Sequence, residues 1–222
     1  ENSIVPVDIS MQLNCGDSIP ALGTDLSGIK TGRIQHNNVL FELKPVNGMH
    51  SIIVGTDGKQ GTSLPKVVTG IPIGASPTSL IFLHASAKAA SNRESFRLIW
   101  DQEDTADLLG WYEIVYQDGF VTTIPIRYGV NILEYNWDQR VSQNDYCYGA
   151  DAVAVANENP SRITFFAFEW INPRLGKVIH EVRLKGTTGF RGASSDYVDD
   201  WGPVIESNAV ILKAISMVQK RS

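Results

Sequence analysis

The chain contains little cysteine. Cys15 and Cys147 are the only two thiols among 222 residues, so a zinc site built from four cysteine ligands cannot form. The two cysteines either pair in one disulfide that closes a very long loop, or remain as two free and buried thiols, which is the simpler reading. In both cases a chain with 43% hydrophobic residues relies mainly on its core for stability.

Clusters of lysine and arginine are also absent. The 19 Lys and Arg residues are scattered along the chain, and 24 Asp and Glu residues give a formal net charge of -5. Binding to a phosphate backbone needs a concentrated basic surface, so we predict no nucleic-acid partner. No stretch approaches the roughly 20 consecutive apolar residues of a membrane-spanning helix, and we predict no membrane span.

Standard catalytic motifs are missing as well. The sequence has no Gly-x-Ser-x-Gly elbow, no His-Glu-x-x-His, no phosphate-binding Gly-x-x-x-x-Gly-Lys and no Gly-x-Gly-x-x-Gly. A glycosidase needs only two carboxylates at a suitable separation, and Glu113, Glu134 and Glu169 are available for that role. We therefore expect a noncatalytic protein, and a glycosidase with paired carboxylates is the less favoured alternative.

The sequence does contain many short segments that are rich in β-branched and aromatic residues and are bounded by turn residues. The clearest predicted strands are 80–85, 112–116, 120–126, 163–170, 178–185 and 209–218, and weaker ones are 5–12, 38–43, 51–54, 66–68, 131–135 and 152–156. Short helical turns are expected only at 86–94 and 105–109. Strands about ten residues apart, without a linker or repeat, predict one all-β domain over residues 1–222, a jelly-roll β-sandwich.

The best hairpin signal is the pair Asp118-Gly119 between two alternating runs. We expect both residues to adopt the positive φ values of a tight two-residue turn. In the strand that follows, the side chains of Phe120, Thr122, Ile124 and Ile126 share one face. This face is predicted to point into the core.

The segment 163–170 is apolar on both faces and predicts a central strand. Glu169 interrupts it, so its carboxylate needs a partner. Arg174 and Arg127 are the candidates, and pairing of either arginine with an acidic sugar is the less favoured alternative. His84 shares a strand face with apolar residues. A hydrogen-bonded core histidine is therefore favoured over an acid or base in catalysis.

Four segments together resemble a known family. They are LPKVVTGIPIG (64–74) leading into LIFLHA (80–85), GWYEIVYQDG (110–119), TIPIRYGVNI (123–132) and FEWINPR (168–174). Their order and spacing are similar to the galactose-binding-like β-sandwich domains that accompany bacterial glycoside hydrolases and other secreted polysaccharide-degradation proteins. The resemblance implies a secreted, periplasmic or cell-surface location, a carbohydrate or a neighbouring catalytic domain as partner, and sugar binding by loops at one end of the sandwich.

Two loops carry the residue types that recognise sugars, which are aromatic rings for stacking and planar polar groups for pairing with hydroxyls. The candidate ligand-binding residues are Tyr135, Trp137, Asp138 and Arg140 in the first loop and Tyr197 and Trp201 in the second. The alternative is that these aromatic residues close the sandwich end or pin the loops. In that case the chain is a structural or protein-interaction domain that binds no sugar.

Two acidic runs provide oxygen ligands that calcium prefers. The first holds Asp101, Glu103, Asp104 and Asp107, and the second holds Asp196, Asp199 and Asp200. Neither run has the spacing of an EF-hand loop, so solvated acidic loops are favoured over a structural calcium ion. No other cofactor is indicated.

Overall fold

The computed structural model describes residues 2–58, 61–89, 108–137, 147–158, 161–187 and 206–220. Strands dominate these residues, and two short 3-10 helices, η1 (Ser10–Gln12) and η2 (Pro20–Leu22), are their only helical elements. The chain is therefore all-β, as the sequence predicts.

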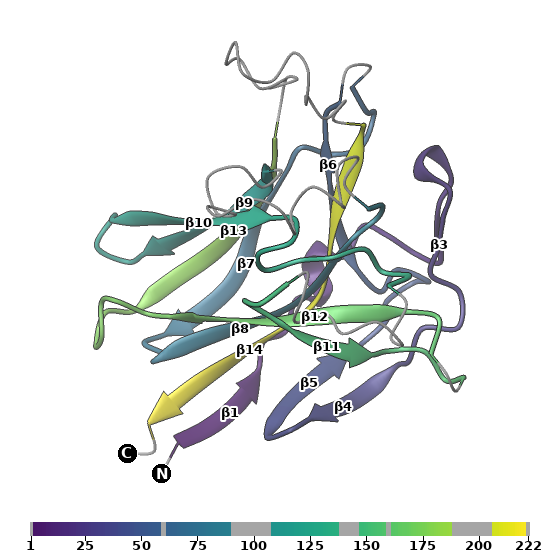
Figure 1. Cartoon of the computed structure of the whole chain (residues 1–222). Coiled ribbons are helices and arrows are strands. Elements are labelled where there is room, and N and C mark those ends of the chain that lie inside the picture. Colours follow the sequence, from purple (N-terminus) through teal and green to yellow (C-terminus); the bar gives the residue numbers. More distant parts are fainter. Residues whose placement is uncertain are drawn as a thin grey trace.

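The strands form two antiparallel sheets and two small hairpins (Figure 1). The larger sheet has the order β1 (Asn2–Pro6), β14 (Asn208–Lys220), β8 (Ser79–Ser86), β12 (Thr164–Ile171) and β11 (Asp151–Ala154), with β6 (Ile52–Thr56) also paired to β14. The smaller sheet has the order β10 (Val121–Arg127), β9 (Leu108–Tyr116), β13 (Ile179–Gly186) and β7 (Val67–Ala75). The hairpins are β2 (Ser18–Ile19) with β3 (Thr24–Asp25), and β4 (Gly32–His36) with β5 (Val39–Leu43).

The two sheets pack face to face through an aromatic stack, which makes the fold a β-sandwich. Phe82 of β8 lies against Tyr112 of β9 with ring centroids 4.0 Å apart, and Phe168 of β12 stacks beside Phe82. Every residue of β8 is buried, because the other face of the larger sheet is also covered. There the Ser216 hydroxyl donates to the Leu40 carbonyl of the β4–β5 hairpin.

His84 is part of this core, as predicted. Its Nδ1 accepts a hydrogen bond from the Tyr112 hydroxyl at 2.8 Å, and its Nε2 donates to the Asn131 carbonyl at 2.7 Å. Burial lowers the pKa of His84 to about 4, so the ring is neutral at physiological pH. Both cysteines are free and buried, which confirms the simpler of the two readings.

The clearest predicted strands all correspond to observed strands, and 163–170 forms a central one, β12, between β8 and β11. Two of the weaker strand predictions were wrong for most of their length. In segment 5–12 the strand ends at Pro6, and η1 follows at Ser10. Segment 131–135 contributes only isolated β-bridges. The helical turns expected at 86–94 and 105–109 fall mainly on residues 90–107, which lie outside the described ranges. Of the described residues in these segments, Ser86 ends β8 and Leu108 begins β9.

The predicted hairpin joins β9 to β10, but its turn differs from the expected one. Only Gly119 has a positive φ, of 84°. The Gly119 amide donates to the Tyr116 carbonyl, and the Tyr116 amide donates to the Phe120 carbonyl, which is the pattern of a turn that ends in a left-handed glycine. Ile124 and Ile126 face the core as predicted, whereas Phe120 lies at the tip and is 50% exposed.

Candidate functional site

The outer face of the smaller sheet carries an aromatic and charged surface. In β9 the side chains of Tyr112, Ile114 and Tyr116 are buried between the sheets, so the alternate residues point outward. The outward residues of β9 and β13 are half-buried, and the residues of β10 and β7 that pair with them at the two edges of the sheet are exposed. We call this surface the Trp111 face; it comprises Trp111, Glu113, Val115, Val121, Thr123, Pro125, Glu181, Arg183, Lys185, Val67 and Pro72.

Strand register arranges the Trp111 face in rows, because residues paired across antiparallel strands share one face. Trp111 is paired with Pro125 on one side and Lys185 on the other, and Lys185 is paired in turn with Val67. The next row along the strands holds Thr123, Glu113 and Arg183. A third row holds Val121, Val115, Glu181 and Pro72.

A network of ion pairs connects the charged side chains of this face. Lys185 Nζ lies 2.7 Å from Glu113 Oε1 and Arg183 Nη1 lies 3.7 Å from Glu113 Oε2, while Arg183 Nε donates to Glu181 Oε1 at 2.6 Å. The indole Nε1 of Trp111 donates to Glu113 at 3.4 Å. These contacts fix the positions of the ring and of the polar groups beside it.

The Glu113 carboxylate is charged at neutral pH. Burial raises the pKa of Glu113, but hydrogen bonds from Lys185 and Trp111 and the charges of Lys185 and Arg183 outweigh that effect, and the pKa lies below its ordinary value. The group is therefore a hydrogen-bond acceptor and not a proton donor.

The three carboxylates considered for glycosidase chemistry do not share one surface. Glu113 lies on the outer face of the smaller sheet. Glu169 points away from the aromatic stack, on the opposite outer face of the sandwich, and accepts a hydrogen bond from the Ser79 hydroxyl at 2.5 Å. Glu134 is buried, and the Tyr128 hydroxyl donates to it. Glu113 and Glu169 therefore cannot act on one glycosidic bond.

Two of the six predicted ligand-binding residues lie in the described ranges. The Tyr135 ring is half-buried against the core, and its hydroxyl oxygen accepts a hydrogen bond from the Asp25 amide at 3.3 Å. Trp137 is only 2% exposed, so its ring has no free face for stacking on a sugar in this conformation. Asp138, Arg140, Tyr197 and Trp201 lie outside the described residues, as do both acidic runs considered for calcium.

Arg174 pairs with Asp118 and not with Glu169, so the expected pairing of Arg174 with Glu169 was wrong. The two Nη atoms of Arg174 donate hydrogen bonds to the Asp118 carboxylate at 3.0 and 2.8 Å. Its guanidinium also lies 4.6 Å from the ring centroid of Tyr116 and 4.4 Å from that of Phe120. The hydrogen bonds from Arg174 lower the pKa of Asp118 to about 2. Sequence could not find this partner, because Asp118 and Arg174 meet only when the two sheets pack.

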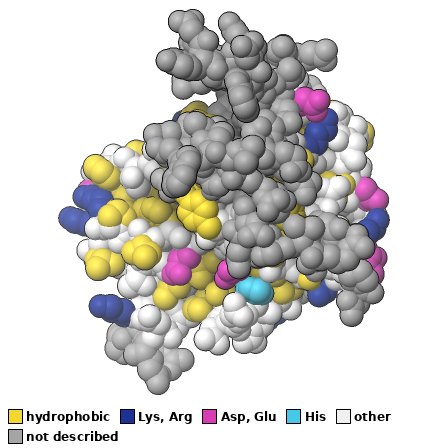
Figure 2. Space-filling model, in the orientation of Figure 1, with side chains coloured by type: hydrophobic (Ala, Val, Ile, Leu, Met, Phe, Trp, Pro, Cys, Tyr) yellow, Lys and Arg dark blue, Asp and Glu magenta, His cyan; other side chains and the backbone are white. Residues whose placement is uncertain are grey.

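Exposed apolar side chains gather at the same end of the sandwich. Phe120, Ile171 and Leu175 are 50%, 73% and 64% exposed. In Figure 2 hydrophobic side chains are visible on the left, where Figure 1 shows the β9–β10 hairpin and the β12–β13 connection.

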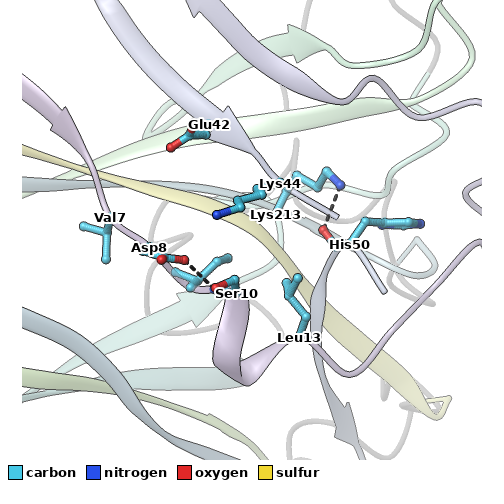
Figure 3. Close-up of a pocket in the computed structure, with 9 residues that line it drawn as sticks. Val7, Asp8, Ser10, Leu13, Glu42, Lys44, His50 and Lys213 are labelled. Atoms are coloured by element: carbon cyan, nitrogen blue, oxygen red, sulfur yellow. Dashed lines mark hydrogen bonds between the residues drawn. The ribbon is translucent and has the colours of Figure 1, made fainter. Parts of the chain in front are cut away.

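A second polar site surrounds Lys213 of β14 (Figure 3). Lys213 is 2% exposed, and its Nζ donates to the His50 carbonyl at 2.7 Å. Burial lowers the pKa of Lys213 to about 7. The adjoining pocket, lined also by Val7, Asp8 and Leu13, is about large enough for one water molecule.

His50 links Ser51 and Asp17 in an order that resembles a catalytic triad. His50 Nδ1 lies 2.9 Å from Ser51 Oγ, and His50 Nε2 lies 3.2 Å from Asp17 Oδ1. A catalytic serine must meet its substrate while the acid is buried. Here Ser51 is fully buried and the Asp17 side chain is 71% exposed, so the arrangement is reversed and offers no accessible nucleophile.

Within the described ranges, no group of three or more His, Cys, Asp and Glu side chains could hold a metal ion. No helix in this part of the chain is long and apolar enough to span a membrane. Comparison of the chain with protein-family models, curated proteins and solved structures finds no match in any of the three.

The Trp111 face was missed by the sequence reasoning, although a signal for it was present. Residues 181–185 alternate strictly between polar and apolar side chains, and Trp111 and Glu113 stand two positions apart in segment 111–115, so the polar residues of each segment share one face of their strand. The sequence does not state that these two segments are neighbours in one sheet. Only that pairing brings Trp111, Glu113, Arg183 and Lys185 together.

Proposed function

We propose that this chain is a noncatalytic carbohydrate-binding module, of the galactose-binding-like type that accompanies glycoside hydrolases, and that it operates outside the cytoplasm in a secreted, periplasmic or cell-surface protein. The observation that carries the proposal is the Trp111 face. There a partly exposed tryptophan on the outer face of the smaller sheet lies beside carboxylate and guanidinium groups that are held by ion pairs.

This combination suits a sugar because each ring of a glycan has an apolar C–H face and a rim of hydroxyl groups. An indole is large and rigid, and it contributes apolar contact area with little loss of conformational entropy. Glu113 accepts hydrogen bonds, and Arg183 donates them in a planar geometry. Because these groups are already held in place, binding does not have to order them.

The arrangement supports binding without catalysis. A glycosidase acts through two carboxylates, one of which is protonated to act as the acid. Glu113 is ionised and paired with Lys185, and Glu169 lies on the other side of the sandwich. Neither group is placed to donate a proton to a glycan on the Trp111 face.

Affinity electrophoresis and titration calorimetry against a panel of plant and host polysaccharides test the proposal. We expect Trp111→Ala to weaken binding by about tenfold or more, because the stacking surface is lost. Phe120→Ala is the matched control, since it removes an exposed aromatic ring from the end of the sandwich and leaves the Trp111 face intact.

Absence of binding to every glycan by the wild-type chain would overturn the proposal. So would binding that survives Trp111→Ala. The exposed apolar residues Phe120, Ile171 and Leu175 would then favour the alternative, a structural or protein-interaction domain.

A further inference from the structure

We propose that the ligand of the Trp111 face is a linear, uncharged polysaccharide that lies across the four strands and is bound along the interior of its chain. This inference rests on the proposed function and adds to it the chemical class of the glycan and its direction on the sheet. Three features of the face support it: its charge balance, the order of its rows and its open edges.

The charged groups within the three rows cancel. Two carboxylates, Glu113 and Glu181, stand against two cations, Arg183 and Lys185. Each cation lies within 2.7 Å of a carboxylate oxygen, so its charge is compensated before any ligand arrives. A face built to hold uronic acids or sulfate esters would present cations without such compensation. Hydroxyl groups, by contrast, bond equally well to carboxylate and guanidinium groups.

The rows separate apolar from polar contacts. The first row combines the Pro125 and Trp111 rings, the aliphatic stem of Lys185 and the Val67 side chain. Neighbouring strands are about 4.8 Å apart, so this row extends roughly 14 Å across the sheet. That length matches a short oligosaccharide and exceeds a single sugar ring.

The second row runs beside the first, about 7 Å away along the strands. It holds Thr123, Glu113 and Arg183, all of which form hydrogen bonds with hydroxyl groups. A chain of flat sugar rings laid along the first row would place its C–H faces on Trp111 and Pro125. The hydroxyl groups on one rim would then face the second row.

The face is open where a chain must enter and leave. In the part of the sheet that the structure describes, β10 and β7 are the edge strands. The residues of the first row on these edges are exposed: Val67 is 47% exposed, and Pro125 is also exposed. Neither carries a charge or a bulky side chain that would stop a polymer. The site is therefore suited to the middle of a chain and not to its end.

The test is titration calorimetry of the whole chain with neutral hydroxyethylcellulose, xylan and galactomannan, and with anionic polygalacturonate and carrageenan. Each is measured from about 0.05 M to about 0.5 M sodium chloride, a range over which screening removes most attraction between exposed charges. We expect at least one neutral polymer to bind with an affinity that changes less than twofold with salt and falls about tenfold in Trp111→Ala. Oligosaccharides of the same polymer should bind more tightly with each added ring until they span the row. Free monosaccharides should bind at least tenfold more weakly.

Two results would overturn this inference and leave the proposed function standing. One is Trp111-dependent binding of an anionic polymer that weakens as the salt concentration rises. The other is binding of a monosaccharide that is as tight as binding of the polymer. Loss of the proposed function itself has a different signature, which is no Trp111-dependent binding to any glycan. A second variant, Glu113→Gln, keeps the shape of the second row and removes one charge. If the ligand is neutral, this change should alter affinity by only a few fold and should not introduce a salt dependence.

Discussion

Replacing Lys213 with methionine is expected to remove most of the rise in stability that we predict for the wild-type chain between pH 7 and pH 9. The folded-state pKa of Lys213 is about 7, against an ordinary value of 10.5. Between these values the unfolded chain binds a proton that the folded chain lacks, so the free energy of unfolding increases with pH. Integration from pH 7 to pH 9 gives a gain of about 2 kcal/mol. Methionine is uncharged in both the folded and the unfolded chain, so it contributes no such increase in the free energy of unfolding.

This pH window isolates the lysine. The pKa of His50 is lowered from 6.5 by burial and by the charge of Lys213, so the titration of this neighbouring group lies below the window. Burial raises the pKa of Cys15 from 9.0 to about 11 and that of Cys147 from 9.0 to about 12. Ionisation of these thiols in the unfolded chain therefore lowers stability only as the pH approaches 9, and it does so in the wild type and in both variants. Lys44 lines the same pocket but is exposed, and Lys44→Met is the matched control. Urea unfolding followed by tryptophan fluorescence measures all three chains, and parallel curves for wild type and Lys213→Met would contradict the expectation.

Gly186→Ala is expected to destabilise the fold by about 3 kcal/mol or to prevent folding, which makes it the most damaging small substitution that we identify. Gly186 ends β13 where the smaller sheet meets β6 of the larger one, and an added Cβ would clash with the carbonyl oxygen of Gly55. Both backbones are held there, because the Gly186 amide donates to Lys66 O and the Gly55 amide donates to Pro65 O. The clash can be relieved only if the two sheets separate at this corner.

Gly119→Ala provides the comparison. Gly119 has a φ of +84°, and an added Cβ meets nothing within 4 Å, so the substitution carries only the strain of a left-handed backbone, about 1 kcal/mol. Thermal and urea unfolding should therefore rank the chains wild type, Gly119→Ala, Gly186→Ala in order of falling stability. Equal losses of stability in the two variants would contradict this expectation, because they would show that the sheets are not in tight contact at Gly186.

Much of the secondary structure follows from local pattern. Segments such as 80–85 and 209–218 are long apolar runs between turn residues, and both became buried strands. Weakly patterned segments were harder to assign. β7 reaches from Val67 to Ala75, although only 66–68 was predicted, because Gly70 and Gly74 take positive φ values that let the strand continue with irregular register against β13.

The site could not be predicted to the same degree. The loop aromatics were chosen because aromatic and polar residues are adjacent in sequence, yet Trp137 is buried. The Trp111 face, in contrast, combines residues from four strands that span positions 67 to 185. A local pattern cannot show which strands become neighbours, so it could not reveal this surface.

By itself the sequence determined that the chain is all-β, where its strongest strands run, and that Ile124, Ile126 and His84 face the core, because alternation along a strand is a local property. The tertiary structure decided which side chains interact. It paired Arg174 with Asp118 and placed Glu113 between Lys185 and Arg183. It also set Lys213 in a bulge of β14 between Leu212 and Ala214, where simple alternation no longer applies. Such contacts join residues far apart in the chain, and they exist only after the sheets have formed and packed.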